Sequence, residues 1–106
     1  MGSKKNRLIK ELSNFKQRIT NVFDVKRMIL FGSMAGGKIH KWSDVDLIIV
    51  GKKFEGLKFY KRSIGLYDYW DLKYPVDFIC YTPKEFEKLS KQITIVSQAL
   101  KEGIEI

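Results

Sequence analysis

Residues 28–50 read MILFGSMAGGKIHKWSDVDLIIV. Apolar runs at 28–31 and 45–50 flank a polar segment, which predicts two buried strands joined by a loop. The first run ends at Gly32-Ser33, and Asp44-Val45-Asp46 opens the second after ten intervening residues. Side chains alternate faces along a strand, so Asp44 and Asp46 should project on one side, about 7 Å apart. These carboxylates would repel each other, and bound Mg²⁺ or Mn²⁺ would relieve the repulsion.

The Gly32-Ser33 pair is the second element of this segment. A strand that ends in glycine and enters a helical turn presents backbone N–H groups, and glycine lets a phosphate approach closely. Ser33 adds a hydroxyl donor. The alternative is an ordinary strand-to-helix turn with Ser33 as the N-cap. The fixed spacing to the carboxylate pair on the next strand favours the phosphate-binding interpretation.

A third acidic residue, Asp77, interrupts an apolar strand predicted over 76–81. An ionised carboxylate in such a strand needs a partner. If this strand lies beside the 45–50 strand, Asp77 can approach Asp44 and Asp46, which gives the three carboxylates that two-metal phosphoryl transfer requires. The alternative is that Asp77 lies near solvent or pairs with Lys73.

The remaining elements follow from periodicity and capping signals. A helix is predicted over about residues 4–23, because apolar residues recur there at intervals of three and four. These residues are Leu8, Leu12, Phe15, Ile19 and Val22. A helix of mixed pattern is expected from Phe54 to about Tyr74. Another begins at Thr82-Pro83, which has a capping box, and a last one ends at Gly103 in a left-handed stop. The inward residues of the last helix are expected to be Ile93, Val96, Ala99 and Leu100.

Composition limits the class of protein. The 106 residues, 44% of them hydrophobic, are enough for one folded domain over 1–106. The formal charge of +8 is compatible with polyanionic partners such as nucleotides or RNA, but lysines spread along a chain are more typical of an ordinary solvated surface. Cys80, the single cysteine, cannot form an internal disulfide and is expected to be a buried thiol. Without an apolar run long enough to span a membrane, a cytoplasmic location is expected.

The segment GSMAGGKIHKWSDVD (32–46) resembles the signature of the minimal nucleotidyltransferases of the DNA polymerase beta superfamily: Gly-Ser, ten residues, then Asp-x-Asp. The resemblance covers nearly the whole chain. It implies an α/β fold with a small mixed sheet and helices mainly on one face. It also implies that Gly32 and Ser33 bind the triphosphate of ATP, that Asp44 and Asp46 hold two Mg²⁺ or Mn²⁺ ions, and that Asp77 holds the ion that activates the acceptor hydroxyl.

The same resemblance implies transfer of a nucleoside monophosphate, AMP from ATP, to a hydroxyl acceptor. Small members of this family pair with an all-helical HEPN-type toxin, act as its antitoxin and adenylylate it. The chain departs from the family at Met34 and Gly36, where arginines are usual. Lys38 and Lys41 could replace them as point charges. A second hypothesis is therefore a binding module that neutralises its partner by contact alone.

Two further patterns in the sequence bear on function. Residues 32–38 also match most of a phosphate-binding P-loop, but Ile39 stands where Ser or Thr must bind Mg²⁺, and the required helix is interrupted. Aromatic residues are more numerous after residue 58 than one buried face needs. They predict a surface for another protein or for a second copy of the chain. They are Phe59, Tyr60, Tyr67, Tyr69, Trp70 and Tyr74.

Overall fold

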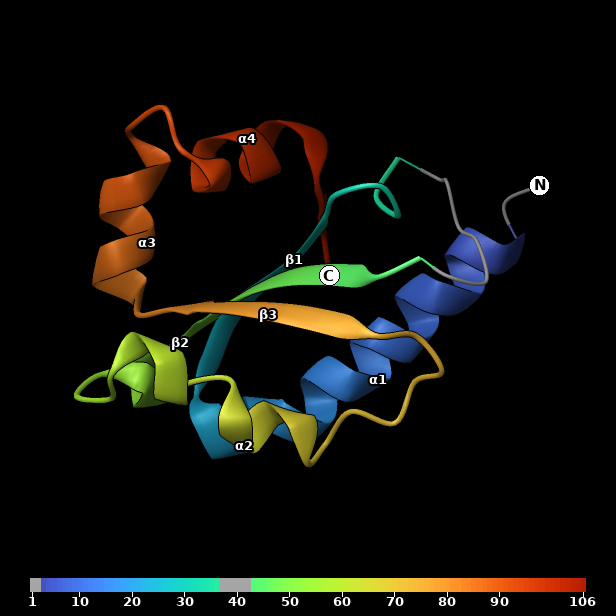
Figure 1. Ribbon diagram of the computed structural model, residues 1–106, viewed down its shortest axis with the longest axis horizontal. Coiled ribbons are helices and arrows are strands. Elements are labelled where there is room, and N and C mark those ends of the chain that lie inside the picture. The colour runs from blue at the N-terminus through green and yellow to red at the C-terminus, as the bar shows by residue number, and fades with distance from the viewer. Residues whose placement is uncertain (1–2, 37–42) are drawn as a thin grey trace.

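The structure is a computed structural model, and it describes residues 3–36 and 43–106. A twisted sheet lies between two helical layers (Figure 1). The helices are α1 (Ser3–Phe23), α2 (Ile64–Tyr67), α3 (Pro83–Ser90) and α4 (Ile95–Glu102), and the strands are β1 (Val25–Phe31), β2 (Val45–Gly51), β3 (Val76–Tyr81) and β4 (Ile104–Glu105). Short 3₁₀ helices occupy Lys52–Phe54 and Phe59–Lys61. No helix in the described ranges is long and apolar enough to cross a membrane.

The sheet is mixed and has the strand order β3-β2-β1-β4. Strand β1 is antiparallel to both β2 and β4, whereas β2 and β3 are parallel. The parallel pair needs a long crossover, which residues 52–75 supply. The expected α/β fold with a mixed sheet is confirmed, and so is the placement of β3 beside β2.

Helix α1 covers one face of the sheet and forms the larger core. Its predicted apolar face is confirmed, because Leu8, Leu12, Phe15 and Ile19 are all at most 2% exposed. Val22 was expected on this face but is 45% exposed. The chain turns into β1 at Asp24, which has a φ of 52°, and Phe23 packs on Phe54 in its place.

Helices α3 and α4 cover the opposite face, so the sheet carries helices on both sides and not mainly on one face as expected (Figure 1). Phe86, Val96 and Ala99 pack there on alternate residues of β1 and β2. The Thr82 capping box is confirmed: Glu85 N–H donates to Thr82 Oγ1, and Thr82 N–H donates to Glu85 Oε1. Phe86 is buried as its place in this helix requires.

The end of α4 differs from the prediction. Gly103 is extended, with φ −83° and ψ 177°, because the chain continues into β4 instead of stopping in a left-handed turn. A Cβ at this position would lie 2.7 Å from the carbonyl oxygen of Leu30, so glycine allows the close approach to β1. Ile93 precedes the helix and is fully exposed, and Leu100 is 38% exposed, so neither belongs to the core.

The continuous helix expected over 54–74 is wrong. Only the four residues of α2 are α-helical there, and Gly56 has a φ of +82° that interrupts any helix. Tertiary contacts hold the segment instead, since Trp70 packs edge-on against Phe15 and Phe78. Cys80 is buried, as predicted, and burial raises its pKa to about 12.

Candidate active site

The central carboxylate of the candidate site is Asp46 on β2. In the sheet it pairs with Phe31 of β1 on one side and with Asp77 of β3 on the other. Asp46 is half-buried, whereas Asp77 and Asp44, the residue before β2, are exposed. The parallel register therefore brings two of the three predicted carboxylates side by side.

Asp46 and Asp77 belong to the same face of the sheet. On β2, Val45 and Leu47 contribute to the α1 core, while Ile48 and Val50 contribute to the core under α3 and α4. Because side chains alternate along a strand, Asp46 shares the face of Ile48. Asp44 comes directly before β2, and its place on this face stays a prediction. On β3, Ile79 and Tyr81 pack on that same side, and alternation places Asp77 with them. The structure therefore brings Asp46 and Asp77 together on this face, and the gathering of all three carboxylates around a metal stays a prediction.

The charges of these residues act on one another. Burial raises the pKa of Asp46, and the neighbouring charges of Asp77 and Asp44 raise it further. Within residues 3–36 and 43–106, no three His, Cys, Asp or Glu side chains gather closely enough to form a complete metal site. The donor set is nevertheless composed of oxygen ligands with surplus negative charge, which is the chemistry that Mg²⁺ or Mn²⁺ requires.

Gly32 connects the phosphate-type turn to this carboxylate face. It has a φ of +78°, which L side chains rarely adopt, and an added Cβ would overlap Asp46 Oδ2. Its carbonyl accepts the N–H of Ala35 at 3.2 Å, and Ser33 O accepts that of Gly36 at 3.2 Å, so the chain forms a tight turn. The hydroxyl-bearing Ser33 is exposed on that turn.

Not every predicted residue can be placed. Lys38 and Lys41 lie outside the described residues, so their contact with a nucleotide stays a prediction. Lys73, the alternative partner of Asp77, lies over the ring of Tyr74 at 5.4 Å from its centroid. Asp77 is exposed, which agrees with the alternative prediction that it lies near solvent. It also pairs in register with Asp46, which the candidate metal site needs.

A pocket of about 250 Å³ adjoins Gly32, and the residues that complete it are not among those predicted from the sequence. Helix α4 supplies Ile95, Gln98, Ala99 and Glu102, which form one helical face because they are spaced by three and four residues. Phe31 and Gly32 supply the other wall. One feature of the sequence points to this pocket: Gln98 and Glu102 form a polar i, i+4 pair on the helix face that also carries Ala99.

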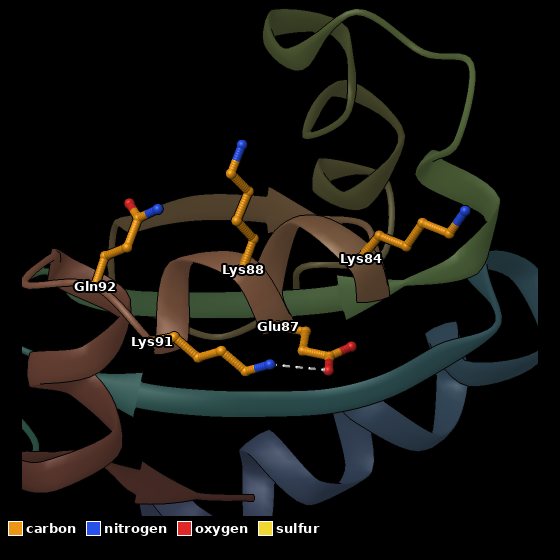
Figure 2. A pocket seen from close by; sticks show the side chains of 5 residues that line it. All are labelled: Lys84, Glu87, Lys88, Lys91 and Gln92. Carbon is orange, nitrogen blue, oxygen red and sulfur yellow. Dashed lines mark hydrogen bonds and ion pairs between the residues drawn. The ribbon is translucent and has the colours of Figure 1, made fainter.

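A second hollow, about 420 Å³, lies on the outer face of α3 and carries Lys84, Lys88 and Lys91 (Figure 2). Lys91 pairs with Glu87 at 3.5 Å, and the amino groups of Lys84 and Lys88 diverge (Figure 2). Divergent exposed lysines are typical of a solvated surface. RNA contact through the basic surface stays a prediction.

Known proteins resemble this chain in sequence and in fold. The chain is 31% identical over 101 residues to the "Putative protein adenylyltransferase MJ0141" of Methanocaldococcus jannaschii, covering 93% of this chain and 98% of that protein. Its fold is similar to a crystal structure described as a "putative nucleotidyltransferase" from Sulfolobus solfataricus, with a TM-score of 0.67, 18% identity and coverage of 97% of this chain and 82% of that chain. Residues 6–104 match the family described as "Nucleotidyltransferase domain". The chain therefore belongs to the nucleotidyltransferase domain family.

Proposed function

We propose that this nucleotidyltransferase moves AMP from ATP to a hydroxyl group of a partner protein. The observation that carries the proposal is the position of Asp46, which lies beside Asp77 on β3 and against Gly32 of the turn. This arrangement joins a candidate phosphate site to a candidate metal site on one face of the sheet. The name of the archaeal relative, which specifies a protein adenylyltransferase, supports AMP as the group and protein as the acceptor.

The proposed roles follow from the carboxylate chemistry. Asp44, Asp46 and Asp77 would hold two Mg²⁺ or Mn²⁺ ions, which when bound neutralise the triphosphate and lower the pKa of the attacking hydroxyl. Gly32 and Ser33 would contact the phosphates through backbone N–H groups and the serine hydroxyl. The acceptor oxygen forms a bond to the α-phosphorus, the bond to the bridging oxygen breaks, and pyrophosphate leaves. Asp77, exposed at the edge of the site, is positioned to accept the hydroxyl proton.

Exposed apolar side chains in one segment of the chain support a protein acceptor. Five residues between 57 and 67, which we call the 57–67 patch, are each at least 43% exposed. They are Leu57, Phe59, Tyr60, Ile64 and Tyr67. Exposed lysines, Lys58 and Lys61, lie within the same segment. Apolar and aromatic side chains with a cationic border fit a partner that presents an apolar surface edged by acidic residues.

We propose a small helical, HEPN-type toxin as this partner, with the chain acting as its antitoxin. A second copy of the chain is disfavoured at the 57–67 patch, because an isologous contact would bring the same lysines together. The acceptor and the ATP donor would then meet at the carboxylate face after the complex forms.

A second candidate function is neutralisation of the partner by contact without transfer. One observation favours it: Met34, which stands at a position where the resembling family usually has arginine, is fully buried in the α1 core. The turn therefore has an apolar anchor where an arginine would contact the triphosphate. Binding of the partner through the 57–67 patch would not need those arginines.

One experiment separates the two candidates. The protein is incubated with α-labelled ATP, Mg²⁺ and a small helical HEPN-type protein as the candidate partner, and label on that protein is measured. Transfer predicts label on the partner that is lost in Asp46→Asn and retained in Asp68→Asn, an exposed carboxylate on the opposite helical layer. A stable complex with no label would support the contact-only function and reject the transferase.

A further inference from the structure

The pocket beside Gly32 has lining residues suited to binding a planar ring. Its walls are the half-buried ring of Phe31, the side chains of Ile95 and Ala99, and the backbone of Gly32, and its volume is about 250 Å³. Ligand pockets in proteins typically combine apolar walls with a few polar groups that fix orientation. Here the polar groups are the side chains of Gln98 and Glu102.

These two side chains are joined to each other. Gln98 Nε2 donates a hydrogen bond to Glu102 Oε2 at 3.2 Å across one turn of α4. A carboxylate only accepts, so Glu102 fixes which end of the Gln98 amide is the nitrogen. An amide nitrogen carries two hydrogens, so a second N–H and the Oε1 acceptor stay available to a ligand.

The pocket shares its Gly32 wall with the candidate site. Gly32 also lies against Asp46, as the overlap of an added Cβ with Asp46 Oδ2 shows. A nucleotide with its phosphates at the turn and the carboxylates would therefore have the pocket within its own length. Phe31, which pairs with Asp46 across β1 and β2, places an aromatic ring at the boundary between the two.

We propose that this pocket seats the base of the donor nucleotide and that Gln98, oriented by Glu102, selects adenine. The inference rests on the proposed function, because it takes ATP as the donor. Adenine presents a 6-amino donor beside an N7 acceptor, and the glutamine amide satisfies both with its Oε1 and its second N–H. Guanine presents two acceptors, O6 and N7, at the same edge, so Oε1 would face an acceptor and lose its partner.

The test is equilibrium binding of ATP and of GTP, each with Mg²⁺, to the intact chain and to three variants. Gln98→Leu removes both hydrogen-bonding groups from an exposed side chain, so the fold is retained. Glu102→Gln replaces the fixed acceptor by an amide that can present either end. Gln92→Leu is the matched control, because Gln92 is an exposed glutamine on the α3 surface of Figure 2, away from the Gly32 pocket.

The unaltered protein is expected to prefer ATP over GTP by about tenfold. Gln98→Leu should lower ATP affinity by about the same factor and leave GTP affinity unchanged. Glu102→Gln should reduce the preference, and Gln92→Leu should retain it. If the protein binds ATP and Gln98→Leu keeps the ATP-to-GTP ratio of Gln92→Leu, adenine selection by Gln98 is rejected while the transferase stands. If the unaltered protein binds neither nucleotide, both the proposed function and this inference are rejected.

Discussion

Asp46 and Asp77 lie next to each other on the parallel strands β2 and β3, with no residue between them in the sheet. Their charges oppose each other, since Asp77 contributes to the raised pKa of Asp46. A fold does not gain stability from two adjacent carboxylates on one face. The divalent cation of the proposed function would relieve this repulsion.

Replacement of Asp77 by asparagine should stabilise the metal-free protein and abolish transfer. Removing one of two adjacent like charges is expected to raise the free energy of unfolding by about 0.2–1 kcal/mol, measured by urea denaturation in the presence of a chelator. AMP transfer should fall by about a hundredfold or more, because a metal-binding carboxylate is lost. A loss of stability in Asp77→Asn would contradict the repulsion described above.

Gly32→Ala should destabilise the fold more than Gly56→Ala does. Both glycines have positive φ, +78° and +82°, so alanine carries a similar backbone cost of about 1–2 kcal/mol at each. Only at Gly32 does the added Cβ also overlap Asp46 Oδ2, whereas nothing lies within 4 Å at Gly56. The loss of unfolding free energy should therefore be larger for Gly32→Ala than for Gly56→Ala. Equal losses would contradict the close contact between Gly32 and Asp46.

The buried cation Arg62 is held by Glu85, and breaking this pair should be costly. Arg62 is 7% exposed, and its Nη1 donates to Glu85 Oε1 at 2.5 Å and to the carbonyl of Cys80 at 3.1 Å. Glu85→Gln leaves a buried charge without its counter-ion and is expected to cost about 1–3 kcal/mol of unfolding free energy. Glu87→Gln is the matched control on the same helix, where an exposed pair with Lys91 should cost less than about 0.5 kcal/mol.

The same pair gives a pH dependence. Hydrogen bonds from Arg62 hold the pKa of Glu85 below its usual range. A lowered pKa in the folded state contributes stability above the ordinary glutamate pKa and loses it as pH falls through the lowered value. The difference in unfolding free energy between the unaltered protein and Glu85→Gln should therefore shrink from about pH 7 to about pH 3. A constant difference over this range would exclude the ion pair as its cause.

Substitutions in the 57–67 patch should weaken partner binding without unfolding the chain. Tyr60 and Ile64 are 66% and 63% exposed, so Tyr60→Ser and Ile64→Ser should change the melting temperature little. Each is expected to cost about 1–2 kcal/mol in binding of the partner protein, measured by calorimetry, if the patch is the contact. Ile93→Ser, at a fully exposed isoleucine outside the patch, is the control and should bind normally.

Local signals predicted those elements whose cause is local. The spacing of Leu8, Leu12, Phe15 and Ile19 identified the face of α1, and the Thr82-Pro83 start with its capping box fixed the beginning of α3. The strand over 76–81 was predicted with the bounds that the structure shows. In each case the residues that generate the pattern are also the residues that make the contacts.

Predictions failed where distant contacts override the local pattern. Residues 54–74 have helical spacing, but the segment is held by packing of Trp70 on α1 and by hydrogen bonds of Arg62 to β3 and α3. Gly103 is a typical residue for a left-handed helix stop, but the chain there is extended because it continues into β4, which pairs with β1. The residues that make these contacts lie far along the chain, so the local sequence pattern does not reveal them.

The chain's own order of residues determined the two halves of the candidate site: a glycine-serine turn after one strand, and carboxylates at alternate positions of the next. That prediction is local, because it needs only the alternation of side chains along a strand. The tertiary structure decided that β3 pairs in parallel with β2, which brings Asp77 to Asp46. The tertiary structure also places Gln98 and Glu102 in the same pocket as Gly32. These residues are far apart along the chain, and only the packing of α4 on the sheet brings them together.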